Sequence, residues 1–258
     1  MGYPPCMLAF LSPAKSLDYK SAIPEFATTE PRFHDESMQL AAAAAQLGAA
    51  RLQAIMDISE NLAVLNAERY SNFENLPTRA AIYAFAGDVY VGFEAKSLAE
   101  EAVLFAQDHV RMLSGLYGLL RPLDEIRPYR LEMGTRWAPE SGDLYGHWGT
   151  RIAELTAADL DAEGSDTIIN LASKEYWAAV DGKLRSDIRV ITIDFRDTGP
   201  DGNLRFNSFA AKRARGYMAR YICEHRLTDP EALKGFDTDG YAFEPEGSDD
   251  KLWRFVRR

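Results

Sequence analysis

Arginines are concentrated between residues 111 and 137, in the segment RMLSGLYGLLRPLDEIRPYRLEMGTRW, which also holds three glycines and two prolines. Its five arginines are Arg111, Arg121, Arg127, Arg130 and Arg136. Glycines that follow a helix let backbone N–H groups approach a phosphate closely, and a nearby arginine can bind the phosphate through two parallel hydrogen bonds. The segment therefore indicates an anion-binding loop. The alternative is a tightly turned connection in which the arginines tie core elements together.

A second basic segment occupies residues 205–226, where Glu224 is the one acid. Its cationic side chains are Arg205, Lys212, Arg213, Arg215, Arg220 and Arg226. The pattern predicts a helix over residues 210–226. With 3.6 residues per turn, Lys212, Arg215 and Arg220 project near one another while tyrosines face the core. A basic face of this kind suits a phosphate backbone, and the alternative is a solvated surface face.

Ser12 and Lys15 match the Ser-x-x-Lys pattern of penicillin-binding enzymes. The Ser-Asp-Asn and Lys-Thr-Gly motifs that accompany this pattern are absent from the sequence, which disfavours acyl-enzyme chemistry. Because Lys15 follows an apolar stretch that reads as a strand, we expect it to contact an anion from a loop at the end of that strand.

Metal and cofactor motifs are absent from the sequence. The four histidines are scattered without HxxxH or HxxE spacing, and Cys6 and Cys223 form no CxxC pair. There is no P-loop and no GxGxxG fingerprint. We therefore expect no cofactor and no metal, and we find no catalytic triad or carboxylate dyad, which leaves enzymatic activity uncertain and disfavoured.

The elements that must position these groups mix strands and helices. Strands are predicted at 7–11, 167–171, 190–195, 241–243 and 252–256, and helices at 35–46, 49–56, 59–70 and 98–113. Asp201-Gly202 predicts a hairpin leading into a strand at 204–209. The order of these strands and helices along the chain favours an α+β protein. We expect one mixed α/β domain over residues 7–258, with a central mixed sheet flanked by helices.

The composition describes a globular chain. Of 258 residues, 47% are hydrophobic and 26% are charged, which disfavours intrinsic disorder. Residues 1–6 read as a leader before Met7 and lack the basic start of a signal peptide, and no apolar run reaches the ~18 residues of a membrane span. With two cysteines, a reduced cytoplasmic location and no membrane partner are expected.

The net charge of −10 argues against a nucleic-acid partner when taken alone. The acids are unevenly placed, however. Residues 154–166 hold five acids and residues 237–250 hold six, with no lysine or arginine in either stretch. Outside these two stretches the charges nearly balance, so a local positive face is compatible with the acidic total.

Six segments together resemble the YaaA family, the bacterial peroxide-stress resistance proteins. They are LSPAKSLDY (11–19), GDVYVG (87–92), HVRMLSGLYGLLRPLDEIRPYRLEMG (109–134), LYGHWG (144–149), INLASKEY (169–176) and FAAKRARGYMARYI (209–222). The matches run in order across nearly the whole chain, and the long central segment is the most specific of them.

The resemblance implies a cytoplasmic protein induced with peroxide defences and linked to limiting damage from intracellular iron. It also implies binding to duplex and branched DNA with little sequence preference, through a basic cleft on a mixed α/β fold with a helix-hairpin-helix-like element. By matching motif, the cleft residues are Lys15, Arg111, Arg121, Arg130, Lys212 and Arg215. Gly115 and Gly118 would form the hairpin, although their spacing of three differs from the usual spacing of two.

Our leading hypothesis is a non-catalytic DNA-binding protein of the oxidative-stress response that binds duplex, bubble or junction DNA. Arg127, Arg213 and Arg220 join the candidate contacts, and Tyr117 and Tyr129 are expected to stack on unpaired bases. The alternative is an enzyme that holds a small nucleotide or phosphate with the same cations, with Glu132 or Glu175 as general acid or base. Direct iron binding is the third and least favoured possibility.

Overall fold

The structure is a computed structural model that describes residues 6–258, so the predicted leader at 1–6 lies outside the described residues except for Cys6. The strands are β1 (Met7–Leu11), β2 (Arg79–Ala80), β3 (Val110–Ser114), β4 (Gly118–Leu120), β5 (Glu125–Ile126), β6 (Thr167–Asn170), β7 (Arg189–Thr198), β8 (Leu204–Arg205), β9 (Tyr241–Glu244) and β10 (Leu252–Arg257).

The α-helices are α1 (His34–Ala45), α2 (Gly48–Met56), α3 (Glu60–Ser71), α4 (Ala81–Ala84), α5 (Asp88–Phe93), α6 (Glu100–His109), α7 (Leu144–Trp148), α8 (Arg151–Glu163), α9 (Lys174–Trp177) and α10 (Ser208–Glu224). Short 3₁₀ helices are η1 (Phe73–Asn75), η2 (Ala95–Ser97), η3 (Pro230–Gly235) and η4 (Thr238–Gly240). None of the helices within residues 6–258 combines the length and apolar character needed to cross a bilayer.

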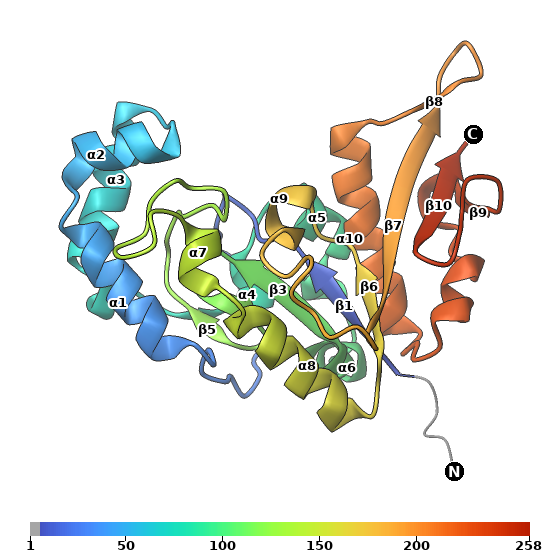
Figure 1. The fold of residues 1–258 in the computed structure, drawn as a ribbon, viewed down its shortest axis with the longest axis horizontal. Coiled ribbons are helices and arrows are strands. Elements are labelled where there is room, and N and C mark those ends of the chain that lie inside the picture. Colours follow the sequence, from blue (N-terminus) through green and yellow to red (C-terminus); the bar gives the residue numbers. More distant parts are fainter. Residues whose placement is uncertain (1–5) are drawn as a thin grey trace.

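One mixed sheet forms the centre of the molecule, with the strand order β4-β3-β1-β6-β7-β10-β9 and with β8 paired to the end of β7. The five adjacent strands β3, β1, β6, β7 and β10 run parallel to one another. Strands β4 and β9 lie at the two edges and run antiparallel to their neighbours. In Figure 1, helices α1, α2 and α3 lie at one end of the long axis, and β9 and β10 lie at the other. The predicted single domain, with a mixed sheet flanked by helices, is confirmed.

The central strand β1 is buried along its whole length, and each of its five residues is at most 1% exposed. A strand between two parallel neighbours is covered on both faces, so it reads as a continuous apolar run rather than an alternating one. This is why the sequence MLAFL predicts the strand with its correct bounds.

The prediction of one helix over residues 98–113 is wrong in its second half. Helix α6 ends at His109, and β3 follows at once, pairing with β1 through Ala9 opposite Val110. Val110–Ser114 is buried throughout. A short apolar run covered on both sides looks the same in a strand and in a buried helix, which is how the error arose. The strand predicted at 204–209 is also shorter, because α10 already begins at Ser208.

Helix α10 begins where the sequence provides a cap, because the Asn207 side chain accepts hydrogen bonds from the N–H groups of Phe209 and Ala210. Its buried face packs on α5 at two glycines. A Cβ at Gly216 would lie 1.9 Å from the carbonyl oxygen of Val89, and one at Gly92 would lie 2.1 Å from that of Arg213. The two helices therefore approach each other backbone to backbone.

We predict that Gly216→Ala destabilises the protein, although alanine is the better helix former by up to ~1 kcal/mol. The new methyl group meets a backbone carbonyl, which cannot rotate away, so α10 must shift from α5. We expect a net loss of about 1–3 kcal/mol in the free energy of unfolding, measured by urea denaturation.

Gly235→Ala is the matched control, because the nearest atom to its new methyl group is the Tyr221 hydroxyl at 3.3 Å. It should change the stability by less than Gly216→Ala. Equal stabilities of the two variants would contradict the close contact between α5 and α10.

Candidate functional site

The carboxyl ends of β1 and β6 meet at a point where the chain changes direction across the sheet. After β1 the next strand of the main sheet is β3, on one side, whereas after β6 the next strand is β7, on the other side. Ligands of open α/β sheets bind in the crevice at such a switch point. A pocket of about 400 Å³ lies here, which falls within the size range of small-ligand sites, about 300–1,000 Å³.

Four segments far apart in the sequence line this pocket. They are the loop after β1, the start of α5, the loop after β6 with α9, and the first turns of α10. The lining residues are Ser12, Pro13, Ala14, Lys15, Ser16, Gly87, Asp88, Val89, Tyr90, Ser173, Glu175, Tyr176, Lys212 and Arg215. Four of the six segments that resemble the YaaA family therefore converge on one pocket.

Hydrogen bonds hold the two strand-end loops together. The Ser12 hydroxyl accepts a hydrogen bond from the backbone N–H of Ser173 at 2.8 Å, and the Tyr90 hydroxyl donates one to the Ser12 carbonyl at 3.0 Å. Burial raises the pKa of Tyr90 well above its usual value, so this hydroxyl keeps its proton. The floor of the pocket is thus fixed by neutral polar groups.

Three of the predicted cations come together at the pocket: Lys15, Lys212 and Arg215. The Lys15 side chain is 66% exposed and its ammonium lies 3.2 Å from Glu132. Lys212 is exposed on the first turns of α10, and Arg213 beside it is also exposed. Within residues 6–258, Lys212, Arg213 and Arg215 have no carboxylate at ion-pair distance.

Arg215 is the most unusual of these cations because it is largely buried without an acidic partner. Its Nε is buried and has no hydrogen-bond partner among the described residues. Burial lowers the pKa of the guanidinium, and the charge of Asp194 only partly opposes that effect. Asp194 itself is held by Arg196 and Arg254. An unpaired buried charge is costly, so Arg215 suits an anion that enters the pocket from outside.

Both predicted acid–base candidates lie close to the site, in different settings. Glu175 lines the pocket, and its Oε1 accepts a hydrogen bond from the N–H of Gly134 at 3.0 Å. Glu132 lines a smaller neighbouring pocket, where its Oε1 bridges Lys15 and Arg130. Arg130 therefore lies next to the larger pocket, held by its ion pair with Glu132, but it does not line that pocket.

Four of the remaining predicted arginines are engaged elsewhere, whereas Arg136 is exposed. Arg111 is 4% exposed, pairs with Asp159 on α8 and donates to the carbonyls that end α6. Arg121 pairs with the buried Asp124, and Arg127 lies over the ring of Phe73. Arg220 donates to the carbonyls of Phe93 and Glu94 and so ties α10 to the end of α5. None of the four lines the pocket with Lys15 and Lys212.

The residues predicted to form a helix-hairpin-helix element lie instead in a β-hairpin. Gly115 follows β3, and Gly118 opens β4 with a φ of +67°, a left-handed conformation that favours glycine. Tyr117 and Tyr129 are only 2% and 5% exposed and pack edge to face. Neither ring is accessible to a base, which corrects the predicted stacking role.

Sequence reasoning missed two features of this region. Asp88 and Tyr90 line the pocket from the GDVYVG segment, to which the sequence analysis assigned no site residue. Phe206 and Phe209 are 54% and 72% exposed at the start of α10, although the hairpin reading gave them no role. The sequence pattern that could have revealed these exposed rings is a pair of phenylalanines beside a helix-capping asparagine and a basic helix.

The fold and this pocket define a single-domain α/β protein with a pocket at the switch point of its parallel strands, lined by three cations and two acids. A family model described as peroxide stress protein YaaA matches residues 7–247, and the chain belongs to this family. That description is consistent with a role in a stress response.

Relatives of similar length support the assignment. A UPF0246 protein of Rhizorhabdus wittichii is 64% identical over 252 residues, covering 97% of this chain and 99% of the relative. UPF0246 proteins of Cupriavidus metallidurans and of a Jannaschia species are 48% and 50% identical. The alignments cover 98% and 93% of this chain and 99% and 93% of those relatives.

We predict that the same substitution has opposite effects at the half-buried Arg215 and the buried Arg111. Arg215→Met removes an unpaired charge and keeps an unbranched apolar stem, so the free energy of unfolding should rise by about 1 kcal/mol. Arg111→Met leaves the carboxylate of Asp159 with Arg32 as its remaining cation, so the stability should fall by about 3 kcal/mol. Urea denaturation measures both, and a clear loss of stability in Arg215→Met would contradict the unpaired state of this guanidinium.

Proposed function

We propose that this protein binds DNA, with a preference for duplexes that contain unpaired bases, through a basic-aromatic rim made of Phe206, Phe209, Lys212 and Arg213. The observation that carries the proposal is the exposure of both aromatic rings, with Phe209 beside Lys212, a cation that has no acidic partner in the described chain. The Lys212 ammonium lies 5.9 Å from the centre of the Phe209 ring, so charge and ring form one surface.

The rim combines the two contacts that single-stranded and branched DNA require. Phe209, Lys212 and Arg213 occupy positions i, i+3 and i+4 of α10, which place them on one face of the helix. Lysine and arginine neutralise backbone phosphates, whereas an exposed phenylalanine stacks on any base. Neither contact reads the sequence, so the proposed binding has little sequence preference.

The family description supports placing this binding in the peroxide stress response. There we propose that it limits iron-dependent oxidative damage, in the cytoplasm. The free thiols of Cys6 and Cys223 support a reducing compartment.

We predict that Lys212→Ala combined with Arg213→Ala weakens binding to all DNA sequences alike. Each lost phosphate contact should reduce the slope of log affinity against log salt by about 0.9. Arg51→Ala combined with Lys251→Ala is the matched control, since it removes the same charge from two exposed positions outside the rim and the pocket. A fluorescence-anisotropy salt titration measures both, and equal losses in the two double variants would remove the rim from the interface.

Removal of the Phe209 ring should show how much of the DNA affinity comes from base stacking and how much from charge. We expect Phe209→Ala to weaken binding to junction or bubble DNA by about ten-fold, because stacking contributes roughly 1–3 kcal/mol per base, and to change binding to a continuous duplex much less. Leu104→Ala removes another exposed apolar side chain, on α6, and serves as the control. Equal effects of Phe209→Ala on junction and duplex would exclude base stacking.

A second candidate function is favoured by Arg215. Its unpaired guanidinium in a pocket of small-ligand size suits a nucleotide or phosphate, and Glu175 is in position to act as a general acid or base. Competition between labelled junction DNA and a mononucleotide distinguishes the two functions. Displacement at low mononucleotide concentration, abolished by Arg215→Met, would favour the small-ligand site, whereas DNA binding that is untouched by mononucleotide would favour the rim.

A further inference from the structure

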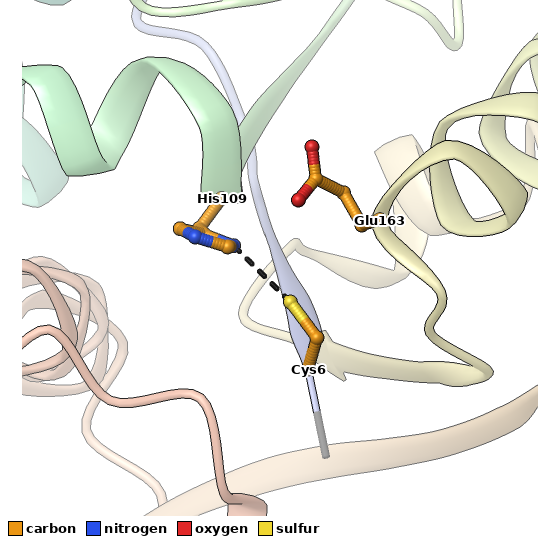
Figure 2. A group of neighbouring side chains, drawn as sticks. All are labelled: Cys6, His109 and Glu163. Atoms are coloured by element: carbon orange, nitrogen blue, oxygen red, sulfur yellow. Dashed lines mark hydrogen bonds between the residues drawn. The ribbon is translucent and has the colours of Figure 1, made fainter. Parts of the chain in front are cut away.

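Three side chains with metal-binding atoms meet at the opposite end of the parallel sheet from the pocket. Cys6 directly precedes β1, His109 directly precedes β3, and Glu163 ends α8 shortly before β6. Strands β3, β1 and β6 are parallel neighbours, so the segments that enter them meet at one edge. One thiol sulfur, one ring nitrogen and one carboxylate oxygen lie within 4.8 Å of one another there (Figure 2).

The distance between sulfur and nitrogen fits a shared metal ion. Cys6 Sγ lies 3.5 Å from His109 Nδ1. In a tetrahedral site with Zn–S near 2.3 Å and Zn–N near 2.0–2.1 Å, these two ligands are about 3.5 Å apart. Figure 2 shows the Glu163 carboxylate pointing toward the same space from the neighbouring helix. Glu163 is exposed, so its carboxylate can close the remaining gap by side-chain rotation.

Local contacts hold two of the three ligands in place. The ring of His109 packs on that of Phe105, with 4.0 Å between centroids. The Ser165 hydroxyl donates a hydrogen bond to the Cys6 carbonyl and so ties the start of β1 to the segment that enters β6. Ligands held before the metal arrives lose less conformational freedom on binding.

We propose that Cys6, His109 and Glu163 form a binding site for Zn²⁺, with the fourth tetrahedral position open to water. Thiolate, imidazole and carboxylate are the ligand types that zinc uses in proteins, and sites with three protein ligands keep the fourth position open. Because the site lies at the amino ends of three neighbouring strands, bound zinc would join segments that enter the centre of the sheet. The site is independent of DNA binding at the rim.

The Glu163 carboxylate places a negative charge beside Cys6 and His109, which favours a bound cation. Burial raises the pKa of the Cys6 thiol, and the charge of Glu163 raises it further, so zinc must displace the thiol proton when it binds. Burial also lowers the pKa of His109, which keeps the imidazole neutral as a metal ligand requires. A raised thiol pKa disfavours the alternative in which Cys6 is an activated nucleophile beside His109, because a nucleophilic thiol needs a depressed pKa.

The test is titration of the full-length, chelator-treated, tag-free protein with Zn²⁺ alone by calorimetry, and with Co²⁺ alone by absorption spectroscopy. We expect one Zn²⁺ per chain and a thiolate-to-cobalt charge-transfer band. Cys6→Ser should abolish the band, and Cys223→Ala, which alters the other thiol, should keep it. Zn²⁺ should also raise the melting temperature of the wild type and leave that of Cys6→Ser unchanged.

Glu163→Gln keeps the proposal testable if substitution of a half-buried ligand impairs folding, because this side chain is exposed. It should weaken Zn²⁺ binding by at least about ten-fold, the loss typical of disturbing even an outer partner of a metal site. Glu246→Gln, at another exposed acid, is the control and should bind as the wild type does. A missing charge-transfer band, a band that survives Cys6→Ser, or equal Zn²⁺ affinities in the Glu163 and Glu246 variants would overturn the site.

Discussion

The parallel pairing of β1 with both β3 and β6 is the interaction on which both ends of the sheet depend. At the carboxyl end it brings Ser12 beside Ser173 and so forms the floor of the pocket. At the amino end it brings Cys6 beside His109. A slip of one residue in either pairing would turn every side chain of β1 to the other face and separate both groups. Burial of all five residues of β1 opposes such a slip.

The arginines divide into those with partners inside the protein and those without. In the 111–137 segment, Arg111, Arg121 and Arg130 each meet a carboxylate and help to hold core elements together. The geometry of this segment thus matches its interpretation as a connection tied by arginines. On α10 the pattern differs, since Arg213 and Arg215 have no carboxylate at ion-pair distance in the described chain. Arg136, the exposed arginine of the 111–137 segment, likewise has no carboxylate at ion-pair distance in the described chain, so the cations available to a ligand lie on α10 and at the end of that segment.

Local sequence patterns were enough to predict several of the strands and helices. The apolar run of β1 and the basic helix at 210–226 were predicted because strand and helix periodicity are short-range properties. The boundary between α6 and β3 was missed because apolar residues buried on all sides carry no period that separates helix from strand. The single mixed domain followed from the order of elements alone.

The residues of the sites could be predicted only in part, because contacts between residues distant in the chain bring them together. Lys15 and Lys212 were expected to contact anions, yet their meeting at one pocket depends on sheet pairings between residues distant in the chain. The same holds for Cys6, His109 and Glu163, whose separation in sequence matches no metal motif. Likewise, no local pattern distinguishes an arginine that pairs with a buried acid, such as Arg111, from one that lacks a partner, such as Arg215.

The acidic net charge is compatible with a basic rim because several of the acids are paired with cations of their own. In the 154–166 stretch, Asp159 is already neutralised by Arg32 and Arg111. In the 237–250 stretch, Asp239 and Glu244 each pair with an arginine at residues 257–258. These acids are engaged inside the protein, whereas Lys212 on α10 has no carboxylate at ion-pair distance in the described chain and stays available to an anion.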